Sequence, residues 1–215
     1  MFDFHTHTFY SDGVLLPSEL VRRVLDKGYT GIALTDHVDF SNVDEVIRAH
    51  RKVKETWDNA DITVLAGIEI THVPPEKIGK LARHAKKAGV DVIVVHGETI
   101  VEPVCPGTNL ASVTNPDIDV LAHPGIISLE EVESAKENGV FLEITSRYGH
   151  NSANGLVARL AKEVDAELIL NTDTHSPSDL ITDDYGLTVL KGSGLTEKEA
   201  LIVMKKSPEK LIQDI

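Results

Sequence analysis

The sequence alternates between short apolar runs and longer amphipathic segments, and this alternation constrains the fold more than any other feature. Several runs are apolar at successive positions and too short for a typical helix, as strands buried on both faces are. Helical segments between such strands indicate parallel strands with right-handed crossovers. Seven repeats of this unit favour a small (β/α) barrel over an open sheet, although spacing alone does not separate the two. The expected strands are Phe2–His7, Gly31–Thr35, Ile62–Ile70, Val92–Val95, Val120–His123, Val140–Thr145 and Leu168–Asn171.

Local signals predict where the last helices begin. Thr196 and Glu199 form a capping box, in which two side chains satisfy backbone N–H groups at a helix start. Further on, Ser207-Pro208 has the pattern of an N-cap and first helical position, which predicts a separate last short helix. No linker or low-complexity segment divides the chain, so its 215 residues predict a single domain over residues 1–215.

Composition excludes several classes of protein. Lys and Arg number 21 against 34 Asp and Glu, a net charge of −13, which counts against a nucleic-acid partner bound through a basic face. The single cysteine, Cys105, excludes an internal disulfide framework and is expected to be a loop thiol. Without signal-peptide features the chain is predicted to be cytoplasmic. Because no run of 18 or more apolar residues occurs, no membrane association is expected.

Histidine and carboxylate side chains gather at the C-terminal ends of the predicted strands. In a parallel barrel these ends converge on one face, where active sites lie. The longest irregular stretch, Gly97–Asn109, follows a strand at the same end. His5 and His7 are two residues apart, as are Asp173 and His175, so each pair points to one side of an extended chain. The candidate metal ligands are His5, His7, Asp12, His37, Glu69, His96, His123, Asp173 and His175.

Nine such groups are too many for one metal ion and suit three ions that share ligands. Imidazole and carboxylate together suit zinc, manganese or iron. A carboxylate such as Glu69 can bridge two ions through its two oxygens. The competing interpretation is a scatter of unrelated core and surface histidines, and the repeated placement at strand ends counts against it. We therefore expect up to three divalent transition-metal ions (Zn, Mn or Fe).

The remaining histidines and Arg147 are predicted to lie outside the set of metal ligands, and some of them have two competing interpretations. His50 lies on the apolar stripe of the second expected helix and is predicted to be a buried packing residue, whereas His84 lies on a polar side and is predicted to be solvated. His72 faces either the site or the surface, with the surface favoured. Arg147 and His150 follow the sixth strand, where they either overhang the metals or belong to a charged surface loop.

These motifs resemble those of the polymerase and histidinol phosphatase (PHP) superfamily of metal-dependent phosphoesterases. The resemblance covers nearly the whole chain. It rests on His5-Thr6-His7 with Ser11-Asp12-Gly13, Thr35-Asp36-His37, Gly67-Ile68-Glu69, His96, Ala122-His123-Pro124, Leu142-Glu143-Ile144 and Asp173-Thr174-His175. It implies an α/β fold, a distorted, TIM-barrel-like (β/α) barrel of seven strands. It also implies one ion near His5, His7, Glu69 and Asp173, a second at Glu69, His96 and His123, and a third at Asp12, His37 and His175.

The expected activity is that of a metal-dependent phosphoric ester hydrolase. Metal ions lower the pKa of bound water to about 7 and so make hydroxide available at neutral pH. Arg147 is expected to contact phosphate through its planar fork, and His150 is a candidate general acid. We expect a phosphatase that acts on a small phosphorylated metabolite, such as a histidinol-phosphate-like monoester. The alternatives are a phosphodiesterase or exonuclease acting on nucleotides or nucleic acid, and a non-catalytic metal-bound scaffold. Substrate identity and oligomeric state do not follow from these motifs.

Overall fold

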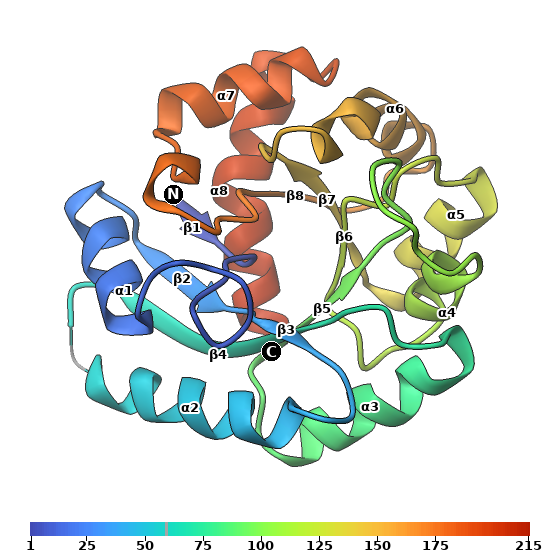
Figure 1. Ribbon diagram of the computed structural model, residues 1–215. Helices are drawn as coiled ribbons and strands as arrows, with labels where there is room; N and C mark the ends of the chain where they lie inside the picture. Colours follow the sequence, from blue (N-terminus) through green and yellow to red (C-terminus); the bar gives the residue numbers. More distant parts are fainter. Residues whose placement is uncertain (59) are drawn as a thin grey trace.

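The computed structural model describes residues 1–58 and 60–215, and its strands form a nearly closed parallel barrel surrounded by helices (Figure 1). Neighbouring strands pair in parallel in the order β1-β2-β4-β5-β6-β7-β8, and the short strand β3 (His37–Val38) pairs with β4. The prediction of an α/β barrel of seven parallel strands is therefore confirmed. The strands are β1 (Phe2–Asp3), β2 (Gly31–Leu34), β4 (Thr63–Ile70), β5 (Val92–His96), β6 (Val120–Ala122), β7 (Phe141–Thr145) and β8 (Leu168–Asn171).

The seam between β1 and β8 closes the barrel with a mixture of backbone and side-chain bonds. The His7 backbone N–H donates to the Thr174 carbonyl at 2.8 Å. The Phe4 N–H donates to the side-chain oxygen of Asn171 at 2.9 Å. Because a side chain replaces part of the backbone ladder here, β1 is shorter than the predicted strand Phe2–His7.

Helices cover the outside of the barrel, and the strands are buried on both faces. The predicted capping box of Thr196 and Glu199 is present at the start of α8. Within residues 1–58 and 60–215, no helix combines the length and the hydropathy that a membrane span requires. The helices are α1 (Pro17–Asp26), α2 (Val43–Thr56), α3 (Pro75–Lys87), α4 (Thr108–Val113), α5 (Leu129–Asn138), α6 (Asn154–Val164), α7 (Asp183–Gly192) and α8 (Glu197–Asp214), with 3₁₀ turns η1 (His150–Ala153) and η2 (Pro177–Asp179).

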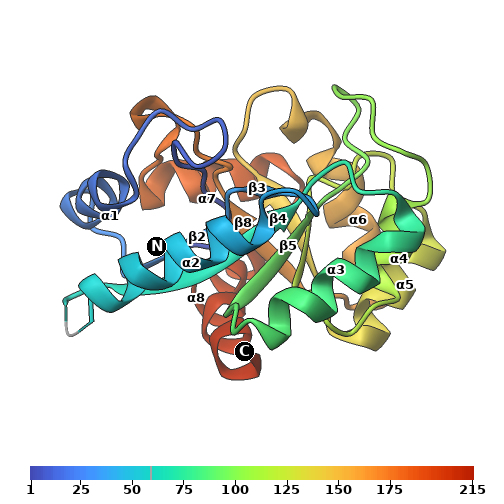
Figure 2. The same ribbon diagram turned by 60° about the horizontal axis from the view of Figure 1, so that its bottom comes forward.

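Helix α8 is continuous, so the prediction that Ser207-Pro208 starts a separate short helix is wrong. Pro208 lies inside α8, and it is buried together with Ser207. The helix continues through the proline because one face, with buried residues three and four apart, packs against the barrel. Near its end Leu211 joins Phe2 and Phe4 in the apolar cluster inside the barrel. Figure 2 shows α8 extending below the strands, so it covers the end of the barrel opposite to the loops that follow the strands.

Candidate metal centre

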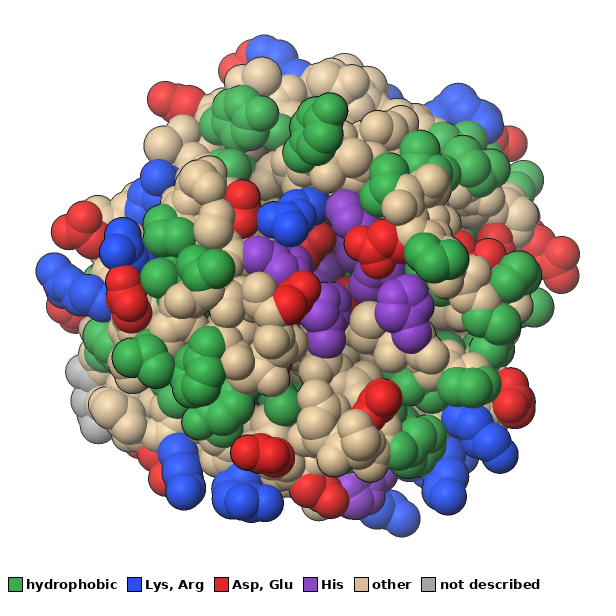
Figure 3. Space-filling view, in the orientation of Figure 1, with side chains coloured by type: hydrophobic (Ala, Val, Ile, Leu, Met, Phe, Trp, Pro, Cys, Tyr) green, Lys and Arg blue, Asp and Glu red, His purple; other side chains and the backbone are tan. Residues whose placement is uncertain are grey.

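The nine histidines and carboxylates selected from the sequence meet at the C-terminal end of the strands. At the centre of the face seen in Figure 3, purple histidine and red carboxylate side chains line a hollow. The corresponding cavity has a volume of about 320 Å³. His5, His7 and Asp12 follow β1, His37 begins β3, Glu69 lies in β4, His96 ends β5, His123 follows β6, and Asp173 and His175 follow β8.

The nitrogen and oxygen atoms that could bind metal form four overlapping groups. Within each group, these atoms all lie within 4.8 Å of one another. The groups are His7, Asp12, His37 and His175; His5, His123 and Asp173; His5, His7 and Glu69; and Glu69, His96 and His123. Glu69 belongs to two groups, and Glu69, His96 and His123 form one group as the resemblance implies. The expected set of His5, His7, Glu69 and Asp173 is divided between two groups, and His7 also joins Asp12, His37 and His175.

Several polar atoms at the centre of this cluster are buried and have no hydrogen-bond partner among the described residues. They include both ring nitrogens of His7, Nε2 of His5, Nδ1 of His123 and Oε1 of Glu69. Leaving a buried polar group unpaired costs about 1–3 kcal/mol. Divalent cations would satisfy such nitrogen and oxygen atoms together, so the residues present fit divalent metal binding.

Burial sets the protonation of the central groups. Burial lowers the pKa of His7 and His123 well below the ordinary value of 6.5, and neighbouring histidines add to the effect. Both rings are therefore neutral at pH 7, and the neutral ring is the form that binds metal. Burial also raises the pKa of Asp173 to about 7, against the opposing charge of His5. A cation beside Asp173 would favour its ionised form.

Glu143 orients the imidazole ring of His5 through a contact with its Nδ1 atom. The Nδ1 atom of His5 lies 2.8 Å from Glu143 Oε1, and the same carboxylate accepts bonds from the His123 backbone N–H and the Asn171 amide, both at 2.9 Å. A proton on Nδ1 leaves the lone pair of Nε2 directed into the cluster, which is how outer carboxylates usually prepare a histidine ligand. The sequence motif included Glu143, but its partners could not be assigned from spacing.

Asp36 anchors the loop that follows β1. Its buried carboxylate accepts bonds from the Thr8 N–H, the hydroxyls of Thr8 and Ser11, and His50 Nε2, at 2.6–2.7 Å. Burial acts to raise the pKa of Asp36, but the hydrogen bond and charge of His50, together with the hydroxyls of Ser11 and Thr8, outweigh it, so the pKa lies below the ordinary 3.8. The prediction that His50 is buried is confirmed, and its other nitrogen, Nδ1, lies 2.9 Å from the Gly67 carbonyl.

Glu102 is a site residue that the sequence did not indicate. It lies in the irregular stretch between β5 and α4, which the structure places beside the cavity as predicted. Glu102 Oε2 lies 3.0 Å from His96 Nε2, and Oε1 lies 3.4 Å from His150 Nε2. His72, for which a surface role was favoured, also lines the cavity, although about half of its side chain is exposed. No spacing rule assigns a carboxylate of an irregular loop to a particular histidine.

Arg147 and His150 line the edge of the cavity, where they overhang the candidate ligands. Arg147 Nη1 lies 3.0 Å from Asp179 Oδ2, and Nε lies 4.0 Å from Asp173 Oδ2. The His150 ring lies 4.4 Å from the His123 ring, measured between centroids. Both side chains therefore lie at the candidate site and not in a surface loop remote from it.

Two residues predicted to lie outside the site do so. His84 is half exposed on α3, with Nε2 2.7 Å from Asp44 Oδ1. Cys105 is an exposed free thiol. Neither lines the cavity.

A sequence profile of the PHP domain matches residues 3–121, more than half of the chain. This chain belongs to the PHP family. The matched PHP segment runs from β1 to β6 and carries six of the nine candidate ligands, from His5 to His96.

Several PHP relatives cover almost the full length of the chain. An uncharacterized protein of Methanocaldococcus jannaschii is 49% identical, with 100% of this chain and 99% of that protein covered. Ribonuclease P protein component 3 of Methanosarcina mazei is 30% identical (99% and 88% covered). A probable phosphatase of Caldanaerobacter subterraneus is 28% identical (98% and 89% covered). A chain in the cryo-EM structure of archaeal ribonuclease P with mature tRNA shares the fold, with a TM-score of 0.72, 15% identity, and 98% and 90% covered.

Proposed function

We propose that this PHP chain is a metal-dependent phosphoesterase that hydrolyses a small phosphorylated metabolite. The observation that carries the proposal is the set of overlapping ligand groups whose central atoms are buried without partners. Up to three zinc, manganese or iron ions would share these ligands. The proposed ligands are His5, His7, Asp12, His37, Glu69, His96, His123, Asp173 and His175.

The bound ions would supply Lewis acidity and a water molecule activated near neutral pH. The chain's own residues prepare the site for this chemistry. Glu143 holds His5 by its Nδ1 atom, and Asp36 holds the loop after β1. Arg147 is fixed by one nitrogen to Asp179, which leaves its other N–H groups to contact phosphate oxygens. The general-acid role of His150 stays a prediction.

The decisive experiment is a screen of phosphomonoesters and phosphodiesters with metal-loaded protein, with metal content measured on the same preparation. We expect metal-dependent hydrolysis of a monoester and at least two metal equivalents per chain. His123→Ala should lose most activity and at least one ion, because His123 belongs to two ligand groups. His84→Ala, on the surface of α3, is the matched control and should change neither. Equal activity and metal content in both variants would contradict the ligand assignment.

A second candidate function is association with nucleic acid. A relative of 30% identity is named ribonuclease P protein component 3, which counts against our expectation that nucleic acid is not a partner. That expectation rested on the net charge of −13, and total charge does not describe every surface of a protein. Gel-shift titrations with a precursor tRNA at several salt concentrations test this candidate. Tight, salt-dependent binding without ester hydrolysis would favour a scaffold role over catalysis.

A further inference from the structure

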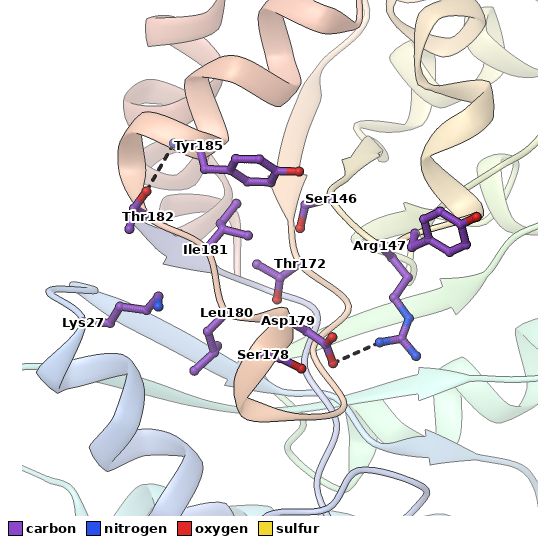
Figure 4. A pocket seen from close by; sticks show the side chains of 11 residues that line it. Lys27, Ser146, Arg147, Thr172, Ser178, Asp179, Leu180, Ile181, Thr182 and Tyr185 are labelled. Carbon is purple, nitrogen blue, oxygen red and sulfur yellow. Dashed lines mark hydrogen bonds and ion pairs between the residues drawn. The ribbon is translucent and has the colours of Figure 1, made fainter.

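A second cavity adjoins the metal centre and shares Arg147 with it. Its volume is about 540 Å³, within the range of small-molecule sites. Figure 4 shows the lining side chains, which come from the end of α1, the segment after β7 and the segment from β8 to the first turn of α7. This cavity is larger than the one over the metal ligands, so a substrate whose phosphate lies at the metals has room here for its remaining atoms.

Arg147 lines both cavities and is paired with Asp179, which lines the second cavity. The ion pair of 3.0 Å between them is drawn as a dashed line in Figure 4. Asp179 is held in turn by the backbone N–H groups of His175 and Ser176, at 3.0 and 2.8 Å. Because its partner is anchored in this way, the guanidinium stays at the junction, where it can contact an anion on the metal side.

Hydroxyl groups line the second cavity, and several of them have no hydrogen-bond partner among the described residues. Thr172 Oγ1 donates to Asp3, and Thr182 Oγ1 accepts the Tyr185 N–H. By contrast, the side-chain oxygens of Ser146 and Tyr185 make no hydrogen bond to the residues that the structure describes. Figure 4 shows both side chains at the cavity. A hydroxyl both donates and accepts, so this pair suits the hydroxyl groups of a sugar or related polyol.

Lys27 provides a cation on the side of the cavity away from Arg147 (Figure 4). Its ammonium forms no ion pair with a carboxylate of residues 1–58 or 60–215, whereas the preceding Arg23 is paired with Glu19 at 2.8 Å. In a chain with a net charge of −13, a cation without an acidic partner beside a cavity is available for an anionic ligand.

We propose that this cavity binds the alcohol part of the substrate and that Lys27 binds a second anionic group on it. The substrate class is a phosphorylated sugar or polyol that carries a second phosphate. This inference rests on the proposed function, because it places the first phosphate at the metal centre. The unused hydroxyls of Ser146 and Tyr185 lie where the sugar would bind.

Binding can be measured without hydrolysis by using phosphonate analogues, in which a CH₂ group replaces the ester oxygen. Isothermal titration calorimetry on the metal-loaded protein would compare the analogues of fructose 1,6-bisphosphate and fructose 6-phosphate. We expect the bisphosphonate to bind about threefold to tenfold more tightly, a modest factor because Lys27 is exposed. Lys27→Gln should abolish this preference and leave the affinity for the monophosphonate unchanged. Tyr185→Phe should weaken both analogues by a similar factor, since both contain the sugar hydroxyls.

Lys205→Gln, an exposed substitution on α8, is the matched control and should retain the preference. Equal affinities in the parent, absence of binding, or a preference that survives Lys27→Gln would each overturn the subsite. Hydrolysis of the two parent esters is assayed separately. A binding preference without turnover would reject the phosphoesterase proposal and retain the subsite. Turnover of the monoester without a binding preference would support the phosphoesterase proposal and reject the subsite.

Discussion

Replacing Asp36 by alanine is expected to destabilise the folded chain, because Asp36 anchors the loop that follows β1. The carboxylate is fully buried and accepts four hydrogen bonds of 2.6–2.7 Å from Thr8, Ser11 and His50. The partner His50 is also buried, and its other ring nitrogen lies 2.9 Å from the Gly67 carbonyl. Removing one partner of a buried ion pair costs about 3–5 kcal/mol. We therefore expect Asp36→Ala to lower the free energy of unfolding by about that amount.

Urea unfolding followed by circular dichroism would measure this loss. Asp36→Asn retains the shape and most hydrogen bonds, so its cost should be smaller, about 1–2 kcal/mol. Asp44→Ala is the control, because that carboxylate is 71% exposed beside His84 and its removal should cost less than about 1 kcal/mol. A loss below about 1 kcal/mol for Asp36→Ala would show that the network does not stabilise the fold.

Three further predictions concern the site and the surface. Arg147→Ala should lower kcat/KM on a phosphate ester about tenfold to a hundredfold with metal content intact, and Arg147→Lys should recover only part; an unchanged kcat/KM would return Arg147 to a surface role. Chelation of bound metal should lower Tm, because the ligands converge only in the folded chain; calorimetry showing the same Tm would argue against a metal centre. Hydrogen bonds from Thr196, followed by Lys162, lower the pKa of Glu199 from 4.5 to about 2, so its stabilising contribution is complete above pH 4.5 and is lost as the pH falls towards 2. The Tm of Glu199→Gln should lie below that of the parent at pH 6 and converge with it near pH 2, and a constant difference would contradict the assignment.

The strands and the candidate ligands were predictable because both depend on local pattern and topology. Buried parallel strands are apolar at successive positions, so their places can be recognised without knowing their neighbours. Once the strands are parallel, their C-terminal ends must converge, and residues as distant as His5 and His175 come together without a pairwise prediction. The assignment of the candidate ligands to three separate ions came from the resemblance to the PHP superfamily, and it stays a prediction.

The remaining features depend on pairings that local pattern does not encode. Glu143 bonds to His5 across 138 positions, and the loop carboxylate Glu102 reaches His96 from an irregular segment. Pro208 gave a local signal for a helix start, but the burial of Leu211 inside the barrel outweighs that signal. In each case the deciding contact joins elements whose relative position is set only by the completed barrel.

The seam between β1 and β8 also determines when the candidate metal ligands can come together during translation. Phe4 bonds to Asn171, which is 167 positions later, and His7 bonds to Thr174. At about 5–20 residues per second, roughly 10–30 s separate the emergence of these segments from the ribosome. During that interval the nascent chain exposes its first histidine pair without the carboxylate of Asp173. Complete occupation of the candidate site would therefore follow synthesis of β8 and the segment after it, and an ion bound earlier would be held by only part of the candidate ligand set.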